Sequence, residues 1–137
     1  MAVRLSDAEL GDRLNRRRGE AVFVPLETAR GAEFNQCHDN AEGYVRENAT
    51  CRIVRGWLVE DFVGFTYFNA HSVVQRPDGT WFDPTPRRRE CPFLSHDGDD
   101  EDFALQRLNR PRVQYPLPTF ELGDLGSPSE PEDEYPL

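Results

Sequence analysis

The chain has 137 residues and a hydrophobic fraction of 37%, which suffices for one modest core and excludes a second catalytic domain. Its formal net charge of -9 argues against sequence-independent binding to nucleic acid or to anionic membranes, because both need a basic surface. The arginine clusters Arg16–Arg18 and Arg87–Arg89 are short, and we interpret them as solvated segments.

The compartment is indicated by the N-terminal segment and by the cysteines. The first residues contain no apolar stretch typical of a secretion signal, and no later segment has the length and hydropathy of a membrane span. Three cysteines, an odd number, favour free thiols over a disulfide framework. We therefore expect a cytoplasmic protein, with delivery by a signal-less secretion route left open.

The N-terminal third begins with a predicted helix. Ser6 and Glu9 have the spacing of a capping box, and leucines follow at helical intervals, so a helix is predicted from about Asp7 to Arg18. An extended stretch at Ala21–Pro25 and a connection at Leu26–Phe34 lead towards the first cysteine. We interpret this third of the chain as scaffold.

A second helix and a group of strands are predicted in the middle of the chain. The helix begins near Cys37 and ends around Asn48. Branched and aromatic residues then predict three strands, and Pro77-Asp78-Gly79 predicts a hairpin between the last two. The strands are Arg52–Val59, Phe65–Gln75 and Thr80–Asp83. The predicted fold class is α+β, with helices packed on a small antiparallel sheet.

The last third is irregular. The acidic run Asp97–Asp102 lacks the loop pattern of an EF-hand, and we interpret it as a solvated loop. A short helix is predicted over Glu101–Asn109. Residues 1–120 are predicted to form one domain, and residues 121–137 an acidic, proline-rich tail that is flexible or is held by a partner.

Cys37 is the first candidate catalytic residue. A thiol in the first turn of a helix is favoured as thiolate by unpaired N–H groups and by the positive end of the helix dipole. The same N–H groups can stabilise the oxyanion of acyl transfer, with the side chains of Asn35, Gln36 or Trp57 as candidate supplements. A lone cysteine is more often a buried apolar residue, so Cys37 needs partners to indicate catalysis.

The predicted hairpin supplies these partners. If Arg76 and Thr80 close the turn, Val73 faces Asp83, and His71 and Asp83 become diagonal neighbours on one face. A carboxylate in this place fixes the tautomer of the imidazole, so that the other ring nitrogen points at the thiol and can take its proton. Taken alone, His71 and Asp83 would each be interpreted as structural.

Four segments of the middle region resemble the core of bacterial transglutaminase-like (papain-like) cysteine enzymes in their order, their spacing and their residue identities. The last of them, with Trp-Phe-Asp-Pro-Thr-Pro, is the most specific. The segments are Asn35-Gln36-Cys37-His38-Asp39-Asn40-Ala41, Arg52-Ile53-Val54-Arg55-Gly56-Trp57, Ala70-His71-Ser72-Val73-Val74 and Gly79-Thr80-Trp81-Phe82-Asp83-Pro84-Thr85-Pro86.

The resemblance implies a cysteine-bearing helix packed on an antiparallel sheet, with Cys37 as nucleophile, His71 as base and Asp83 as orienting group. It implies attack of a thiol on an amide bond of a protein or peptide-like substrate through a thioester, without metal or cofactor. The family contains both hydrolases and acyltransferases, and we expect a hydrolase, with acyl transfer left open. His38 departs from the pattern, because an aromatic or acidic residue is common after the cysteine. It is kept as a candidate substrate-contacting residue.

Two alternatives remain open. The first is a non-catalytic binding module that keeps the fold and presents its tail to a partner. The second is a zinc protein, although the cysteines and histidines lack the usual ligand spacings. The candidate ligands are Cys37, His38, Cys51, Cys91 and His96.

Overall fold

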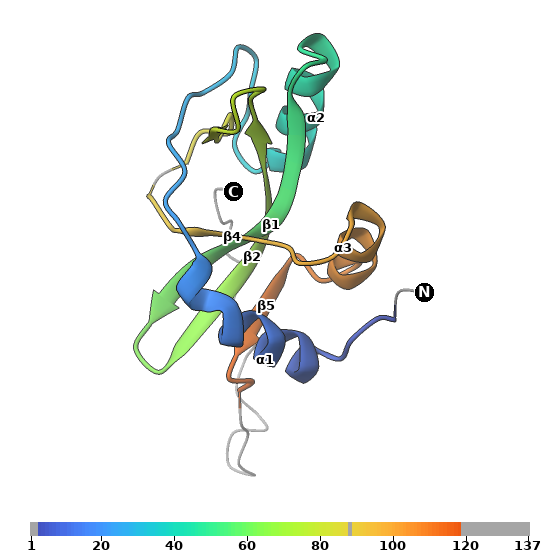
Figure 1. Ribbon diagram of the computed structural model, residues 1–137. Coiled ribbons are helices and arrows are strands. Elements are labelled where there is room, and N and C mark those ends of the chain that lie inside the picture. Colours follow the sequence, from blue (N-terminus) through green and yellow to red (C-terminus); the bar gives the residue numbers. More distant parts are fainter. Residues whose placement is uncertain (1–2, 88, 119–137) are drawn as a thin grey trace.

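The computed structural model describes residues 3–87 and 89–118 (Figure 1). This part of the chain is α+β: three α-helices pack against an antiparallel sheet. None of the helices in the described residues has both the length and the hydropathy to cross a membrane. The predicted tail at residues 121–137 lies outside the described residues.

The sheet is built on one long hairpin. β1 (Arg52–Phe62) pairs with β2 (Phe65–Gln75) along its whole length, so β1 runs three residues beyond its predicted end. The strand order is β3-β2-β1-β4, with β5 also paired to β2. The three short strands are β3 (Trp81–Phe82), β4 (Phe93–Ser95) and β5 (Arg112–Tyr115).

The edge of β2 that faces away from β1 is paired with other strands only in part. Because β1 occupies one edge of β2 completely, β3 and β5 must share the other edge. β5 pairs with residues 66–69 and β3 with residues 74–75. The Ala70 N–H adds one further bond, to the carbonyl of Pro111 at 2.9 Å. Neither β5 nor β3 pairs with residues 71–73, so the strand pairing on this edge has a gap there.

The helices lie at different places along this hairpin. α1 (Asp7–Arg17) has the predicted capping box, with Ser6 Oγ accepting from the Glu9 N–H and Glu9 Oε1 accepting from the Ser6 N–H. α1 lies near β5, whereas α2 (Cys37–Glu47) lies towards the other end of β1 and β2 (Figure 1). The predicted second helix is thus confirmed, with the cysteine as its first residue.

α3 (Asp100–Arg107) begins inside the acidic run that was predicted to be a solvated loop. Asp99 Oδ1 accepts from the Asp102 N–H at 2.8 Å and so caps the helix. Asp97 pairs with Arg13 of α1. Part of the run therefore forms the start of α3, because carboxylates stabilise a helix N-terminus. The Asp97–Arg13 pair connects this segment to α1.

The core is divided between the two faces of the sheet. Alternation along β2 sends Phe68, Ala70 and Val74 to one face and Val73 to the other. The first face packs on α1, α3 and β5 around Trp57, and on α2 near Val74. The second face packs Val73 against Leu58, Val24 and Phe93. α2 is thus held on the face of β2 that also carries Ala70.

Gly56 allows β4 to come close to β1. It pairs with Ser95 of β4 on one side and with His71 of β2 on the other. A Cβ atom at residue 56 would lie 2.3 Å from the Leu94 carbonyl oxygen and 2.6 Å from Phe93 Cζ. The Phe93 ring uses this space and packs edge-on against the His71 ring, with centroids 6.2 Å apart.

Candidate active site

The hairpin between β2 and β3 places His71 beside Asp83. Val74 pairs with Phe82, and this register confirms the one predicted from the turn. The side chains of His71 and Asp83 share one face, and His71 Nε2 lies 2.6 Å from Asp83 Oδ2. Both residues are fully buried, so the pair is shielded from water.

Asp83 is fixed from several directions. The Thr85 N–H donates to Asp83 Oδ1 at 3.0 Å, and Arg87 Nε lies 3.3 Å from Oδ2. The Asp83 N–H donates to the Pro25 carbonyl at 2.8 Å, and its own carbonyl accepts from the Glu27 N–H at 2.9 Å. The carboxylate that orients His71 is therefore itself held rigidly.

Arg87 is a site residue that sequence analysis missed. It was predicted to be solvated, but its side chain is only 4% exposed, because it reaches inward to Asp83. It also donates to the carbonyls of Val24 at 3.3 Å and Cys91 at 3.4 Å. Arg89 behaves as predicted for an exposed arginine and pairs with Glu60. An arginine cluster carries no sequence signal that distinguishes these two positions.

The free nitrogen of His71 has the properties of a base. Nε2 is occupied by Asp83, and Nδ1 is buried with no hydrogen-bond partner of ordinary geometry among the described residues. Buried polar atoms are normally paired, so an unpaired one calls for a functional explanation. Nδ1 is the atom through which the ring can exchange a proton with a reacting group.

Cys37 lies at the edge of β2 where the pairing with β5 ends. Its sulfur is 3.9 Å from the carbonyl oxygen of Ala70, and the residue is 3% exposed. The N–H of Ala70 bonds to Pro111, so the backbone groups of Ala70 point to the outer edge of β2. The thiol therefore sits beside the residue that precedes His71.

The two groups shift each other's pKa in opposite directions. Burial raises the pKa of the Cys37 thiol, but the neighbouring imidazoles of His38 and His71 outweigh it and lower the pKa to about 6. Burial lowers the pKa of His71, but the hydrogen bond and charge of Asp83, together with the neighbouring Cys37 sulfur, outweigh it and raise the pKa to about 9. Both shifts favour a thiolate–imidazolium pair at neutral pH.

Of the three residues predicted to assist the oxyanion, Gln36 and Asn35 lie at the start of α2, whereas Trp57 lies in β1. Gln36 is the N-cap residue of α2, and no side chain of the described residues caps the helix there. Asn35 precedes it with a left-handed φ of 61°, which directs the chain into the helix. Trp57 is fully buried, and its indole N–H donates to His96 Nδ1 at 3.3 Å. The Trp57 donor is thus directed to His96.

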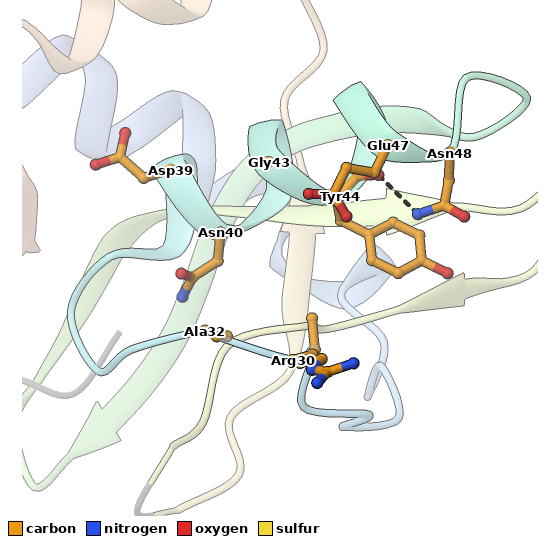
Figure 2. A pocket seen from close by; sticks show the side chains of 10 residues that line it. Arg30, Ala32, Asp39, Asn40, Gly43, Tyr44, Glu47 and Asn48 are labelled. Atoms are coloured by element: carbon orange, nitrogen blue, oxygen red, sulfur yellow. Dashed lines mark hydrogen bonds between the residues drawn. The ribbon is translucent and has the colours of Figure 1, made fainter.

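A pocket lies beside α2 in the described residues, and Cys37 is not among the residues that line it. The pocket is about 230 Å³ and lies between α2 and the segment 29–32. Figure 2 shows Asn40 and Tyr44 of α2 pointing towards this segment. The sulfur of Cys37 is closed off in this conformation. The lining residues are Ala29, Arg30, Gly31, Ala32, Asp39, Asn40, Gly43, Tyr44, Glu47 and Asn48.

The five candidate zinc ligands do not converge. Cys51 packs with Ala41 and Val74 beneath α2, and Cys91 packs near Phe93 on the other face of the sheet. His96 is bonded through both ring nitrogens to protein groups. No cluster of His, Cys, Asp or Glu in the described part of the chain is arranged to hold a metal ion.

Comparisons of the chain with family models, with curated proteins and with solved structures find no match. The positions of Cys37, His71 and Asp83 are therefore the basis of the functional interpretation.

Proposed function

We propose that the protein is a cysteine hydrolase of the transglutaminase-like type that cleaves an amide bond. Cys37 is the nucleophile, His71 the general base and acid, and Asp83 the group that orients His71. One observation carries this proposal: His71 binds Asp83 through Nε2 and has a buried Nδ1 with no hydrogen-bond partner among the described residues, and the Cys37 sulfur lies at the carbonyl of the preceding residue, Ala70. This is the arrangement of nucleophile, base and orienting group that acyl transfer needs.

The reaction follows from the charges of this pair. The Cys37 thiolate attacks the carbonyl carbon of the amide and forms a carbon–sulfur bond. Protonated His71 gives its proton to the leaving nitrogen as the carbon–nitrogen bond breaks, which leaves a thioester. His71 then takes a proton from water, and the hydroxide attacks the thioester. The carbon–sulfur bond breaks, which releases the acid product and restores the Cys37 thiolate beside protonated His71.

The start of α2 supports the charge that develops on the carbonyl oxygen. The first N–H groups of a helix have no intrahelical partner, and in this helix no described side chain caps them. They add hydrogen-bond donors and a positive dipole end to the surroundings of Cys37. The N–H groups of the first turn are therefore proposed as the oxyanion donors, with the exposed Gln36 and Asn35 as supplements.

The substrate class follows from the reaction. An amide of a peptide, of a glutamine side chain or of a peptidoglycan-like link fits attack by a thiolate. Water is the proposed acceptor of the acyl group. All three cysteines are free thiols, which supports action in a reducing compartment such as the cytoplasm.

Alkylation by iodoacetamide tests the nucleophile directly. The full-length protein is labelled between about pH 5 and pH 9, and each cysteine is followed separately by peptide mass mapping. We expect Cys37 to react with a midpoint near pH 6 and faster than Cys51 and Cys91, because the thiolate is the reactive form. His71→Ala should move this midpoint upward and slow the reaction at neutral pH.

The same experiment addresses the alternative. The burial of Cys37 favours a non-catalytic binding module, because a substrate must displace covering atoms before it meets the sulfur. If folded protein shows no preferential labelling of Cys37, or if its rate is indifferent to His71, the hydrolase proposal fails and the binding module is favoured. Preferential, His71-dependent labelling shows that the thiol is both activated and accessible.

A further inference from the structure

A second imidazole lies at the same thiol. His38 follows Cys37 in the first turn of α2 and is half-buried. Its Nδ1 lies 2.6 Å from Ser72 Oγ, and its ring meets that of Phe103 edge-on at 5.9 Å. Among the groups that lower the pKa of Cys37, the hydrogen bond from His38 is the largest. Ser72 and Phe103 thus fix the His38 ring on the residue that follows the thiol.

Ser72 belongs to a chain of hydrogen bonds that joins α2 to both long strands. Arg55 Nη1 donates to Ser72 Oγ at 2.9 Å across the β1–β2 ladder, and Arg55 Nη2 pairs with Glu42 Oε2 at 3.0 Å. Glu42 lies one turn after His38 on the same side of α2. The network His38–Ser72–Arg55–Glu42 thus starts and ends on the helix that carries the thiol.

Ser72 Oγ serves both neighbours. Arg55 can only donate, so it uses one lone pair of Ser72 Oγ, and the hydroxyl proton can be donated to His38 Nδ1. When His38 accepts at Nδ1, its own ring proton lies on Nε2, and this N–H is its remaining donor.

The two histidines are bonded on different faces of β2. Ser72 and His71 are consecutive on β2, so their side chains point to opposite faces of the sheet. His71 lies on the face of Asp83, whereas His38 is bonded on the face of Ser72. Cys37 lies at the edge of the strand between them, next to Ala70. The site is therefore built around two imidazoles.

We propose that His38 is a second catalytic imidazole of the same site, which donates a hydrogen bond to the Cys37 thiolate and is held for this task by Ser72 and Arg55. The inference rests on the proposed function, because it assumes that the Cys37 thiolate is the reacting species. His71 moves the proton in the reaction, whereas His38 keeps its proton and holds the sulfur negative when His71 has given its proton away. Ser72 and Arg55 are positioning residues.

The pH profile of Cys37 alkylation tests this role in the full-length protein. His38→Ala should raise the midpoint by about one pH unit, so that labelling at about pH 5 slows about tenfold. Arg55→Met should shift the midpoint in the same direction by less, because it removes only the support of Ser72. Arg52→Met changes an exposed arginine of the same strand and serves as the matched control.

The outcomes separate this inference from the proposed function. The inference is wrong if His71→Ala shifts the midpoint of Cys37 alkylation but His38→Ala and Arg55→Met have the same midpoint as the unmodified protein. His38 then has no role at the thiol. If His71→Ala also has no effect, the hydrolase proposal itself fails. Circular dichroism reports whether His38→Ala folds, and if it does not, the shift in Arg55→Met decides.

Discussion

Arg87 lies 3.3 Å from the same oxygen of Asp83 that receives the hydrogen bond from His71. One buried carboxylate thus faces two cationic groups, a guanidinium and an imidazolium. Arg87 also binds two backbone carbonyls, so it joins the segment after β3 to the segments around Val24 and Cys91. The position of Asp83 therefore depends on contacts that lie outside the proposed triad.

Arg87→Met should lower the free energy of unfolding by about 3 kcal/mol, because it removes one counter-ion of a buried carboxylate and the donor to two carbonyls. Urea denaturation measures this loss. Arg16→Met is the matched control: Arg16 is exposed and pairs with Asp12 on the surface of α1, so a change within about 0.5 kcal/mol is expected. Equal stability of the two variants would contradict the structural role of Arg87.

Asp83→Asn should lower the pKa of His71 from about 9 towards its ordinary value, since the carboxylate and its hydrogen bond raise that pKa. At about pH 8, His71 of the unmodified protein therefore carries a proton, whereas His71 of the variant is largely neutral. Ring resonances of His71, followed by NMR across pH, measure the midpoint. Asp78→Asn, in the exposed turn before β3, should leave it unchanged, and an unshifted midpoint in Asp83→Asn would rule out Asp83 as its cause.

Gly56→Ala should destabilise the protein by about 3 kcal/mol, because the new methyl group overlaps the Leu94 carbonyl and the Phe93 ring. Thermal unfolding gives the loss. Gly19→Ala places its methyl group in open space and should change stability by less than about 0.5 kcal/mol. If Gly56→Ala is as stable as Gly19→Ala, the close approach of β4 to β1 is wrong.

Trp57→Phe should leave the pH profile of Cys37 alkylation unchanged, because the indole N–H is directed to His96 and not to the thiol. The loss of this buried donor should lower stability by about 1–2 kcal/mol, which denaturant titration detects. If the pH midpoint of Cys37 alkylation shifts in a folded Trp57→Phe variant, Trp57 acts as a donor at the site after all.

Local patterns in the sequence predicted the parts of the fold that depend on few neighbours. The capping box of Ser6 and Glu9 predicted the start of α1, and the turn at residues 77–79 predicted the register that brings His71 to Asp83. Both signals span about a dozen residues or fewer. In a hairpin, the turn fixes the register, and the register fixes which side chains meet.

The parts that the sequence did not predict depend on distant contacts. β4 and β5 have three and four residues, and their pairing with β1 and β2 is set by the packing of Phe93 and Val113 into different core clusters. Arg87 is buried because Asp83, Val24 and Cys91 converge on it. The direction of the Trp57 N–H likewise depends on His96, which a pattern around Trp57 does not contain.

The components of the proposed triad differ in how far apart they lie along the chain. His71 and Asp83 are 12 residues apart on one hairpin, whereas Cys37 reaches Ala70 across 33 residues. Contacts of short sequence separation close with less loss of chain entropy, so the acid–base pair should assemble during folding before α2 docks. A refolding chain would first have an ordinary thiol and acquire a reactive one only at the last step. Pulses of iodoacetamide at mildly acidic pH would then report the docking of α2 in time.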